Sequence, residues 1–288
     1  MATQYTPESK VLISADGTEI YADAIGDRAK PALVFIHGFS LSSVVFDSIF
    51  ADHEWTNHVY LVRYDVRGHG KSGKPIDEAS WESKRLAGDF DAVVEGFKLI
   101  KPIPVGWSMG GTHITDVLSL HPPSYLTGVV YISPLPYMGP ILQQVASPAV
   151  LACLPRFLRT DDVNIFQGTA LEFLDLCSQT CPQSLRLACL GSIMVQPRAV
   201  TQRVLSRTQD QTGLFKAGEE SGLPFLLFDA RADAIIDGKA VRSAVAGWRN
   251  LKVVEIDGAD HMPWVGHPQV VRQGILDWVK GITALRQP

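Results

Sequence analysis

The 288-residue sequence has little charge and no long apolar run. Only 19% of its residues are charged and the formal net charge is −4, which argues against the basic surface that a nucleic-acid partner requires. No stretch approaches the roughly 18 consecutive apolar residues of a membrane span. Hydrophobic residues still make up 46% of the chain, enough for a large core. We therefore expect a soluble globular protein.

Cysteine is also scarce, and no secretory signal is visible. The first ten residues lack the basic and apolar regions of a signal peptide, so we expect a cytoplasmic protein. Its cysteines should then be reduced packing residues, with one or two disulfides as the alternative. No histidine lies among them and no second pair has ligand spacing, which argues against a zinc site. The four are Cys153, Cys177, Cys181 and Cys189.

The most informative segment is Gly106-Trp107-Ser108-Met109-Gly110. It follows a short apolar run at 102–105 and precedes a helix-compatible stretch, so it predicts a strand, a sharp turn and a helix. The glycines suit a turn so tight that side chains there would collide. This pattern predicts a nucleophile elbow that presents Ser108 rather than burying it. A glycine-flanked serine can also be an ordinary helix N-cap, so its partners decide between the two interpretations.

His261 is the predicted general base for this serine. It lies at the start of a loop that Pro263 and Pro268 should keep from becoming helical. A histidine in this position can take the serine proton if the chain brings the two side chains together.

His69 is the rival base, while His37 and His121 are expected to be non-catalytic. His69 lies in a glycine-punctuated loop. Two other residues of that loop, Asp65 and Arg67, are expected to tie it down through hydrogen bonds. We therefore assign this loop a structural role.

Three carboxylates compete to orient the base. Asp233 is the predicted acid because it lies several residues beyond the apolar strand 225–228, where the loop can turn toward His261. Asp229 stands four residues earlier and is the second candidate, and Asp237 stands four residues later.

The chain resembles the α/β-hydrolase superfamily in motifs and in the order Ser108, Asp233, His261. Within it, the chain is most similar to the cofactor-free haloperoxidase and small-molecule esterase or lactonase branch. The resemblance implies a serine triad that needs no cofactor and no metal. It also implies an oxyanion hole formed by the backbone N–H groups of Phe39 and Met109. The four similar segments are LVFIHGFS (33–40), YDVRGHGKS (64–72), GWSMGG (106–111) and GADHMPW (258–264).

Strand and helix patterns alternate through most of the chain, which predicts an α/β fold: a mostly parallel eight-stranded sheet flanked by helices. The turn at Asp16-Gly17 should make the first two strands antiparallel. Helices are expected near 80–99, 109–120 and 269–285. The predicted strands lie near 11–14, 19–25, 32–36, 59–64, 103–105, 128–132, 225–228 and 252–256.

This alternation breaks between 134 and 222, where helix-like pieces follow one another. Pro182 and Pro197 are expected in the first turns of two of these helices. We therefore expect a hydrolase core at 1–133 and 223–288, with 134–222 inserted as a helical cap. Such a cap would cover the carboxyl edge of the sheet, where α/β proteins bind ligands.

The resulting pocket should be apolar and enclosed. Its candidate lining residues flank the expected catalytic positions: Phe39, Leu41, Trp107, Met138 and Trp264. Such a pocket favours a small or medium hydrophobic acyl group or lactone over a polymer or peptide.

The sequence thus predicts a serine hydrolase that cleaves carboxylic esters or lactones through an acyl-enzyme. A carbon–carbon bond hydrolase with the same triad stays open, as does a ligand receptor that retains the pocket. Epoxide hydrolases and dehalogenases of this fold would carry aspartate at position 108. The oligomeric state stays open.

Overall fold

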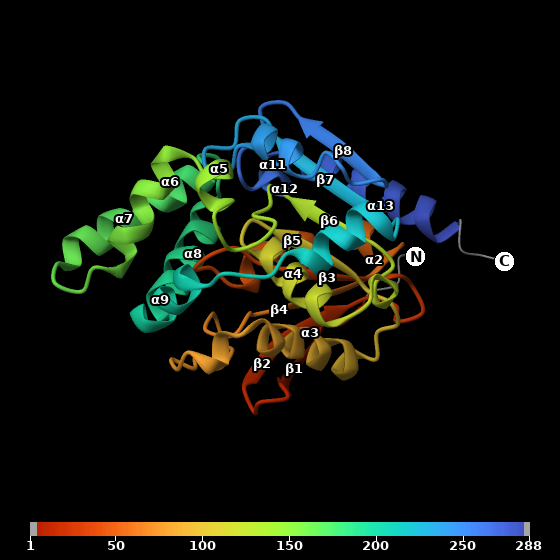
Figure 1. Cartoon of the computed structure of the whole chain (residues 1–288), viewed down its shortest axis with the longest axis horizontal. Coiled ribbons are helices and arrows are strands. Elements are labelled where there is room, and N and C mark those ends of the chain that lie inside the picture. Colours follow the sequence, from red (N-terminus) through yellow and green to blue (C-terminus); the bar gives the residue numbers. More distant parts are fainter. Residues whose placement is uncertain (1–4, 285–288) are drawn as a thin grey trace.

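The computed structural model describes residues 5–284, which build one eight-stranded sheet with flanking helices (Figure 1). The order across the sheet is β1-β2-β4-β3-β5-β6-β7-β8. β1 and β2 are antiparallel, as are β2 and β4, and all later neighbours are parallel. The predicted fold class is confirmed. The strands are β1 (Glu8–Ile13), β2 (Glu19–Ile25), β3 (Ala32–Ile36), β4 (Tyr60–Tyr64), β5 (Ile103–Trp107), β6 (Val129–Ile132), β7 (Phe225–Ala230) and β8 (Leu251–Ile256).

The apolar runs in the sequence become the centre of the sheet. Every residue of β3, β5, β6 and β7 is buried, as expected for parallel strands covered on both faces. β1 alternates partly buried and exposed residues, as an edge strand does. Its start at Glu8 rather than near residue 11 is the largest error among the predicted strand bounds.

Helices fill the connections. The predicted helices at 80–99, 109–120 and 269–285 correspond to α3, α4 and α13, although Leu285 lies outside the described residues. The helices are α1 (Asp47–Ala51), α2 (His53–Thr56), α3 (Ser83–Phe97), α4 (Gly110–Leu120), α5 (Leu142–Val145), α6 (Pro148–Cys153), α7 (Val163–Cys177), α8 (Gln183–Val195), α9 (Arg198–Ser206), α10 (Thr212–Phe215), α11 (Gly238–Ala244), α12 (Pro263–Gly266) and α13 (Pro268–Ala284). Single turns occur at η1 (Ser43–Phe46), η2 (Ala79–Trp81), η3 (Pro123–Tyr125), η4 (Leu154–Leu158) and η5 (Lys216–Glu220).

Two predictions about proline were wrong. Pro263 begins the short helix α12, whereas we expected the loop from His261 to Pro268 to contain no helix. Pro268 begins α13, one residue before the predicted start of the last helix. The first turn of a helix has no acceptor for its N–H groups, so proline is tolerated there. Pro182 and Pro197 are N-caps of α8 and α9, one residue before the first turn in which we placed them.

The segment 134–222, which the sequence suggested as a cap, carries α5 to α10 between β6 and β7. In Figure 1 its helices α6 to α9 lie to the left of the sheet, and α7 reaches farthest from it. All four cysteines belong to this segment and are free thiols; three are buried, as the packing prediction required, and Cys181 is partly exposed. Within residues 5–284, no helix has the length and apolarity to cross a membrane.

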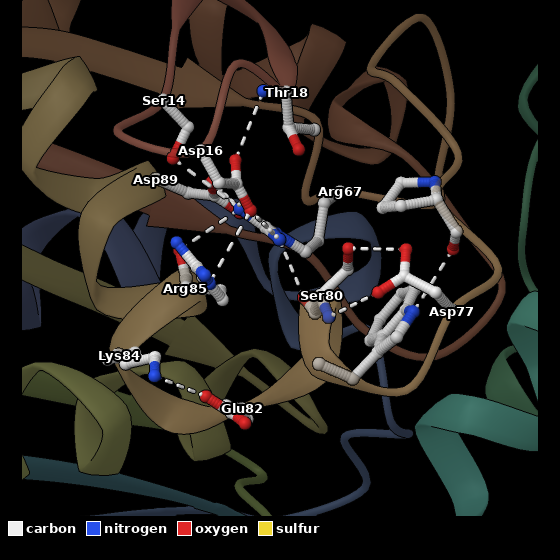
Figure 2. A network of polar contacts seen from close by, with 12 residues as sticks. Ser14, Asp16, Thr18, Arg67, Asp77, Ser80, Glu82, Lys84, Arg85 and Asp89 are labelled. Atoms are coloured by element: carbon white, nitrogen blue, oxygen red, sulfur yellow. Dashed lines mark hydrogen bonds and ion pairs between the residues drawn. The ribbon is translucent and has the colours of Figure 1, made fainter.

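The loop after β4 is held by a buried ionic network (Figure 2). Arg67 is fully buried and contacts Asp89 at 2.6 Å and Asp16 at 2.8 Å. Burial by itself would raise the pKa of Asp16, but hydrogen bonds from Arg67 and Thr18 outweigh it and lower that pKa to about 2. Asp65 accepts hydrogen bonds from the backbone N–H of Ser43, outside the loop, and from that of Lys71, within it. The predicted structural role of Asp65 and Arg67 is confirmed.

Candidate active site

Ser108 lies on a strained turn between β5 and α4. Its φ of 54° is in the left-handed region, which side-chain-bearing residues rarely adopt. A Cβ at Gly110 would lie 2.1 Å from the Ile36 carbonyl oxygen, and one at Gly106 would lie 2.8 Å from the Cα of Gly111. Only glycine fits at these two positions, so the backbone geometry is that of a nucleophile elbow.

The expectation that Ser108 is presented and not buried was wrong. The residue is only 9% exposed, because it faces a cavity rather than solvent. A Cβ at Gly38 would lie 3.2 Å from the Ser108 Cβ, so the segment after β3 also lies against the elbow. The serine thus lies on the wall of this cavity.

His261 and Asp233 meet at the carboxyl edge of the sheet, in the loops after β8 and β7. The His261 Nδ1 lies 2.7 Å from Asp233 Oδ2, and both side chains are 1% exposed. The other Asp233 oxygen accepts the N–H groups of Ile235 and Ile236, at 2.8 and 3.0 Å. A carboxylate so held can accept a hydrogen bond from the Nδ1–H of His261, which leaves the other ring nitrogen free to act as a base.

The other two candidate carboxylates have different partners. Asp229 is buried and forms an ion pair with Arg242. Asp237 caps the N-terminus of α11, where it accepts two backbone N–H groups. Among the described residues, Asp233 is the carboxylate that contacts His261.

The Ser108 hydroxyl makes no hydrogen bond to His261, or to any other residue in the part of the chain that the structure describes. The residue before Ser108 nevertheless contacts His261. The Trp107 ring lies 5.2 Å from the His261 ring, and the Trp107 indole N–H donates to the His261 carbonyl oxygen at 2.7 Å. Catalytic hydrogen bonds are often loose without substrate and shorten when it binds.

The backbone N–H groups of Phe39 and Met109 are both unpaired within residues 5–284. Both residues line the same cavity as Ser108. Met109 is also the N-cap of α4, so the positive end of that helix dipole points toward the same place. Two free amides beside a serine can stabilise an oxyanion.

The cavity beside Ser108 has an apolar wall. Ser108 supplies the only polar side chain among the described residues that line it. Most of the others come from the segment 134–222. The lining residues are Phe39, Ser108, Met109, Leu135, Met138, Leu142, Ala146, Val150, Leu154, Phe173, Leu205, Ile235 and Ile236.

Phe39 and Met138 therefore lie on the wall as expected, whereas Leu41, Trp107 and Trp264 do not. All three are buried elsewhere. The N–H of Trp107 supports the His261 loop, and that of Trp264 donates to a backbone carbonyl at 3.0 Å. Neighbours of a site residue in the chain often point away from the cavity, which explains these errors.

The sequence also missed lining residues that the fold brings in from a distance, such as Val150 and Phe173. One signal was present: Ile235 and Ile236 form an apolar pair inside an otherwise polar loop, two residues after Asp233.

His69 does not act with Ser108. Its Nε2 lies 2.8 Å from the Gln196 amide nitrogen and its Nδ1 lies 3.0 Å from the Arg67 carbonyl oxygen. Burial lowers the pKa of His69 to about 3, so this side chain is neutral and fully bonded. His37 is equally buried, and its Nε2 accepts the N–H of Val66. Within residues 5–284, no three His, Cys, Asp or Glu side chains form a group that could hold a metal ion.

Known proteins resemble the chain over most of its length. Pimeloyl-[acyl-carrier protein] methyl ester esterase of Yersinia enterocolitica is 26% identical over 255 residues, which cover 86% of this chain and 93% of that protein. A putative aryl esterase from Burkholderia cenocepacia has a similar fold, with a TM-score of 0.86 and 23% identity over 96% of this chain and all of that one. An esterase from a Rhodococcus species gives a TM-score of 0.85 at 22% identity, covering 95% of this chain and 99% of its own.

A family model adds to these likenesses. The model of the alpha/beta hydrolase family matches residues 33–273, a range that includes the elbow, the Asp233 loop and the His261 loop. The match extends over well more than half of the 288 residues. The chain belongs to the alpha/beta hydrolase family.

Proposed function

We propose that the protein is a serine hydrolase that cleaves carboxylic esters or lactones with a small or medium hydrophobic acyl group. The observation that carries this proposal is that three features lie in loops at the carboxyl edge of one sheet. These are a strained serine, a histidine paired with a buried carboxylate, and two free backbone amides. Acyl transfer needs all three.

The proposed reaction has two steps. His261 takes the Ser108 proton while the serine oxygen bonds to the ester carbonyl carbon, and the Phe39 and Met109 amides donate to the resulting oxyanion. The carbon–oxygen bond to the alcohol then breaks, and His261 gives its proton to the leaving alkoxide. His261 next takes a proton from water as the water oxygen bonds to the acyl carbon. The acyl–serine bond then breaks, the acid leaves, and His261 returns its proton to the Ser108 oxygen. The Asp233 carboxylate accepts a hydrogen bond from the His261 Nδ1–H throughout.

The substrate class is proposed from the cavity wall. A neutral apolar acyl group would contact residues such as Leu142, Val150 and Phe173, which supply only hydrocarbon surface. In this proposal the segment 134–222 is a cap, because it provides most of that wall. Esters are favoured as a class because the Yersinia relative and the two structural neighbours are named as esterases.

Hydrolysis of p-nitrophenyl esters from acetate to decanoate tests the proposal, with the parent protein compared with Ser108→Ala. The parent is expected to release p-nitrophenol with an optimum at one chain length, and the variant to lose at least about 10⁴-fold in kcat. Circular dichroism should show the same helix content in both proteins. Equal rates in the two proteins would exclude the serine mechanism, and no turnover by the parent would favour carbon–carbon bond hydrolysis or ligand binding without turnover.

A further inference from the structure

The loop that joins α7 to α8 contacts the loop that carries His261. The Ser178 hydroxyl donates to Asp260 Oδ2 at 2.7 Å, and the Thr180 hydroxyl lies 3.4 Å from the same oxygen. Ser178 is 1% exposed, so the donor of this hydrogen bond is buried, while Asp260 is partly exposed. The proposed cap is therefore joined directly to the residue that precedes the proposed base.

Asp260, which precedes His261, also bonds to the residue that follows it. While one of its oxygens accepts from Ser178, the other accepts the backbone N–H of Met262 at 3.0 Å. On its other side the His261 backbone is held through its carbonyl oxygen by the Trp107 N–H. The imidazole is thus carried by a backbone segment with one support from the elbow strand and one from the cap. The proposed mechanism assigns no chemical step to Asp260 or Ser178.

We infer that Ser178 and Asp260 are positioning residues: they fix the place of the His261 imidazole relative to the Ser108 hydroxyl. The inference rests on the proposed serine mechanism and deepens it. Neither side chain forms a hydrogen bond with the imidazole, so each acts through the backbone of the His261 loop. Proton transfer requires near-contact geometry, and a displacement of about 1 Å can cost roughly 100-fold in rate.

Ser178→Ala tests this arrangement, because it removes the hydroxyl and keeps the Asp260 carboxylate. We expect kcat for the preferred p-nitrophenyl ester to fall at least about tenfold, with KM changed by less than about threefold. Ser178→Thr restores a hydroxyl and should recover most of the rate. Ser192→Ala is the matched control: Ser192 is also buried and bonds Ser42 across the same boundary, at 2.7 Å, but does not hold Asp260. Its kcat should match that of the parent.

Two further readouts do not need ester turnover. One is the rate at which a p-nitrophenyl phosphonate modifies Ser108, followed by mass spectrometry. The other is the downfield proton resonance of the hydrogen bond between His261 and Asp233. Ser178→Ala should slow the modification at least about tenfold and shift or broaden the resonance, and Asp260→Ala should do the same if Ser178→Ala does not fold.

The two hypotheses can fail separately. A parent that hydrolyses no ester, yet whose resonance moves in the variants, would reject the proposed function and retain the support of His261 by the cap. Parent-like modification and an unmoved resonance in both variants would overturn the positioning role. An equal loss of kcat in Ser192→Ala would also overturn it, since the effect would then be general loosening of the cap.

Discussion

The sheet and the segment 134–222 contribute different things to the site. The polar groups Ser108, Asp233 and His261 all follow strands of the sheet, at its carboxyl edge. The cavity wall beside them is apolar and comes mostly from the inserted segment. The chemistry proposed here therefore depends on the sheet, and the selectivity on the helices beside it. Apart from the Ser178 contact with the His261 loop, each can be changed without the other, which makes the comparison testable.

The two regions also differ in how they are held. The central strands are fully buried and paired on both sides, whereas the segment 134–222 exposes large apolar side chains, among them Val163 at 72% and Met194 at 66%. Its contacts with the core include a few buried polar pairs, such as Gln196 with His69 and Gln209 with Asp116. We expect this segment to open at a lower free energy than the sheet.

The largest expected effect lies on the sheet side, at the acid. Asp233→Asn should lower kcat by about 10⁴-fold, because the amide cannot hold the His261 tautomer as a carboxylate does. Asp229→Asn is the matched control, since it removes an equally buried charge that pairs with Arg242 instead. Its kcat should stay within about threefold of the parent in p-nitrophenyl ester hydrolysis. The reverse result would make Asp229 the acid.

The second largest expected effect concerns stability and the buried ion pairs of Arg67. Arg67→Ala should lower the free energy of unfolding by about 3–5 kcal/mol, because it leaves the buried Asp89 without its cation. Burial already raises the pKa of Asp89, even with Arg67 beside it. Arg28→Ala, which breaks the largely exposed pair with Glu8, should lower the free energy of unfolding far less. Urea denaturation measures both losses, and equal losses would contradict the importance of burial here.

A change in the cavity wall should alter selectivity without altering the chemistry. Val150→Phe adds bulk inside the cavity, so the optimum should move to shorter acyl chains, with a loss of about 10–100-fold for the longest ester the parent accepts. Turnover of p-nitrophenyl acetate should stay close to the parent value. Val163→Phe places the same side chain on the exposed surface of the same segment and should leave the profile unchanged. An unmoved optimum in Val150→Phe would place the acyl group elsewhere.

The smallest expected effect concerns the pH dependence of stability. It arises where the segment 134–222 contacts the core, at the hydrogen bond from Gln196 to His69. The folded-state pKa of His69 is lowered to about 3, so between that value and the ordinary value near 6.5 the unfolded chain binds more protons. The stability contribution is therefore complete above about pH 6.5 and is lost as the pH falls toward 3.

His69→Gln removes this proton uptake. Its free energy of unfolding should fall less steeply than that of the parent between pH 6 and pH 4, by up to about 1.4 kcal/mol per pH unit. Burial also lowers the pKa of His37, so the variant should keep part of the slope. Urea denaturation at several pH values measures the difference. Parallel curves would show that His69 takes up its proton at the same pH in both states.

The sequence was sufficient for the parts of the molecule that depend on local pattern. Continuous apolar runs gave the buried strands, and the glycines around Ser108 gave the elbow, because each reports a constraint within a few residues. Asp233 was distinguished from Asp229 by its distance from the strand end alone, and the structure places it against His261.

What the sequence could not give depends on contacts between distant segments. Ser178 and Asp260 are 82 positions apart, and Gln196 and His69 are 127 apart, so no local pattern links them. The same reason explains the cavity: Trp107 and Trp264 were chosen for their nearness in the chain, whereas the wall is made by helices that pack in from elsewhere. The short helices between 43 and 56 were not predicted, since each spans about one turn.

The apolar wall has a further consequence for the end of the proposed reaction cycle. A neutral ester loses little on entering a cavity whose described lining offers no charged side chain. The acid that remains after hydrolysis is an anion, and its carboxylate would be costly to keep in the same surroundings. The wall that admits the substrate therefore repels the product, so release of the acid should be fast and inhibition by it weak.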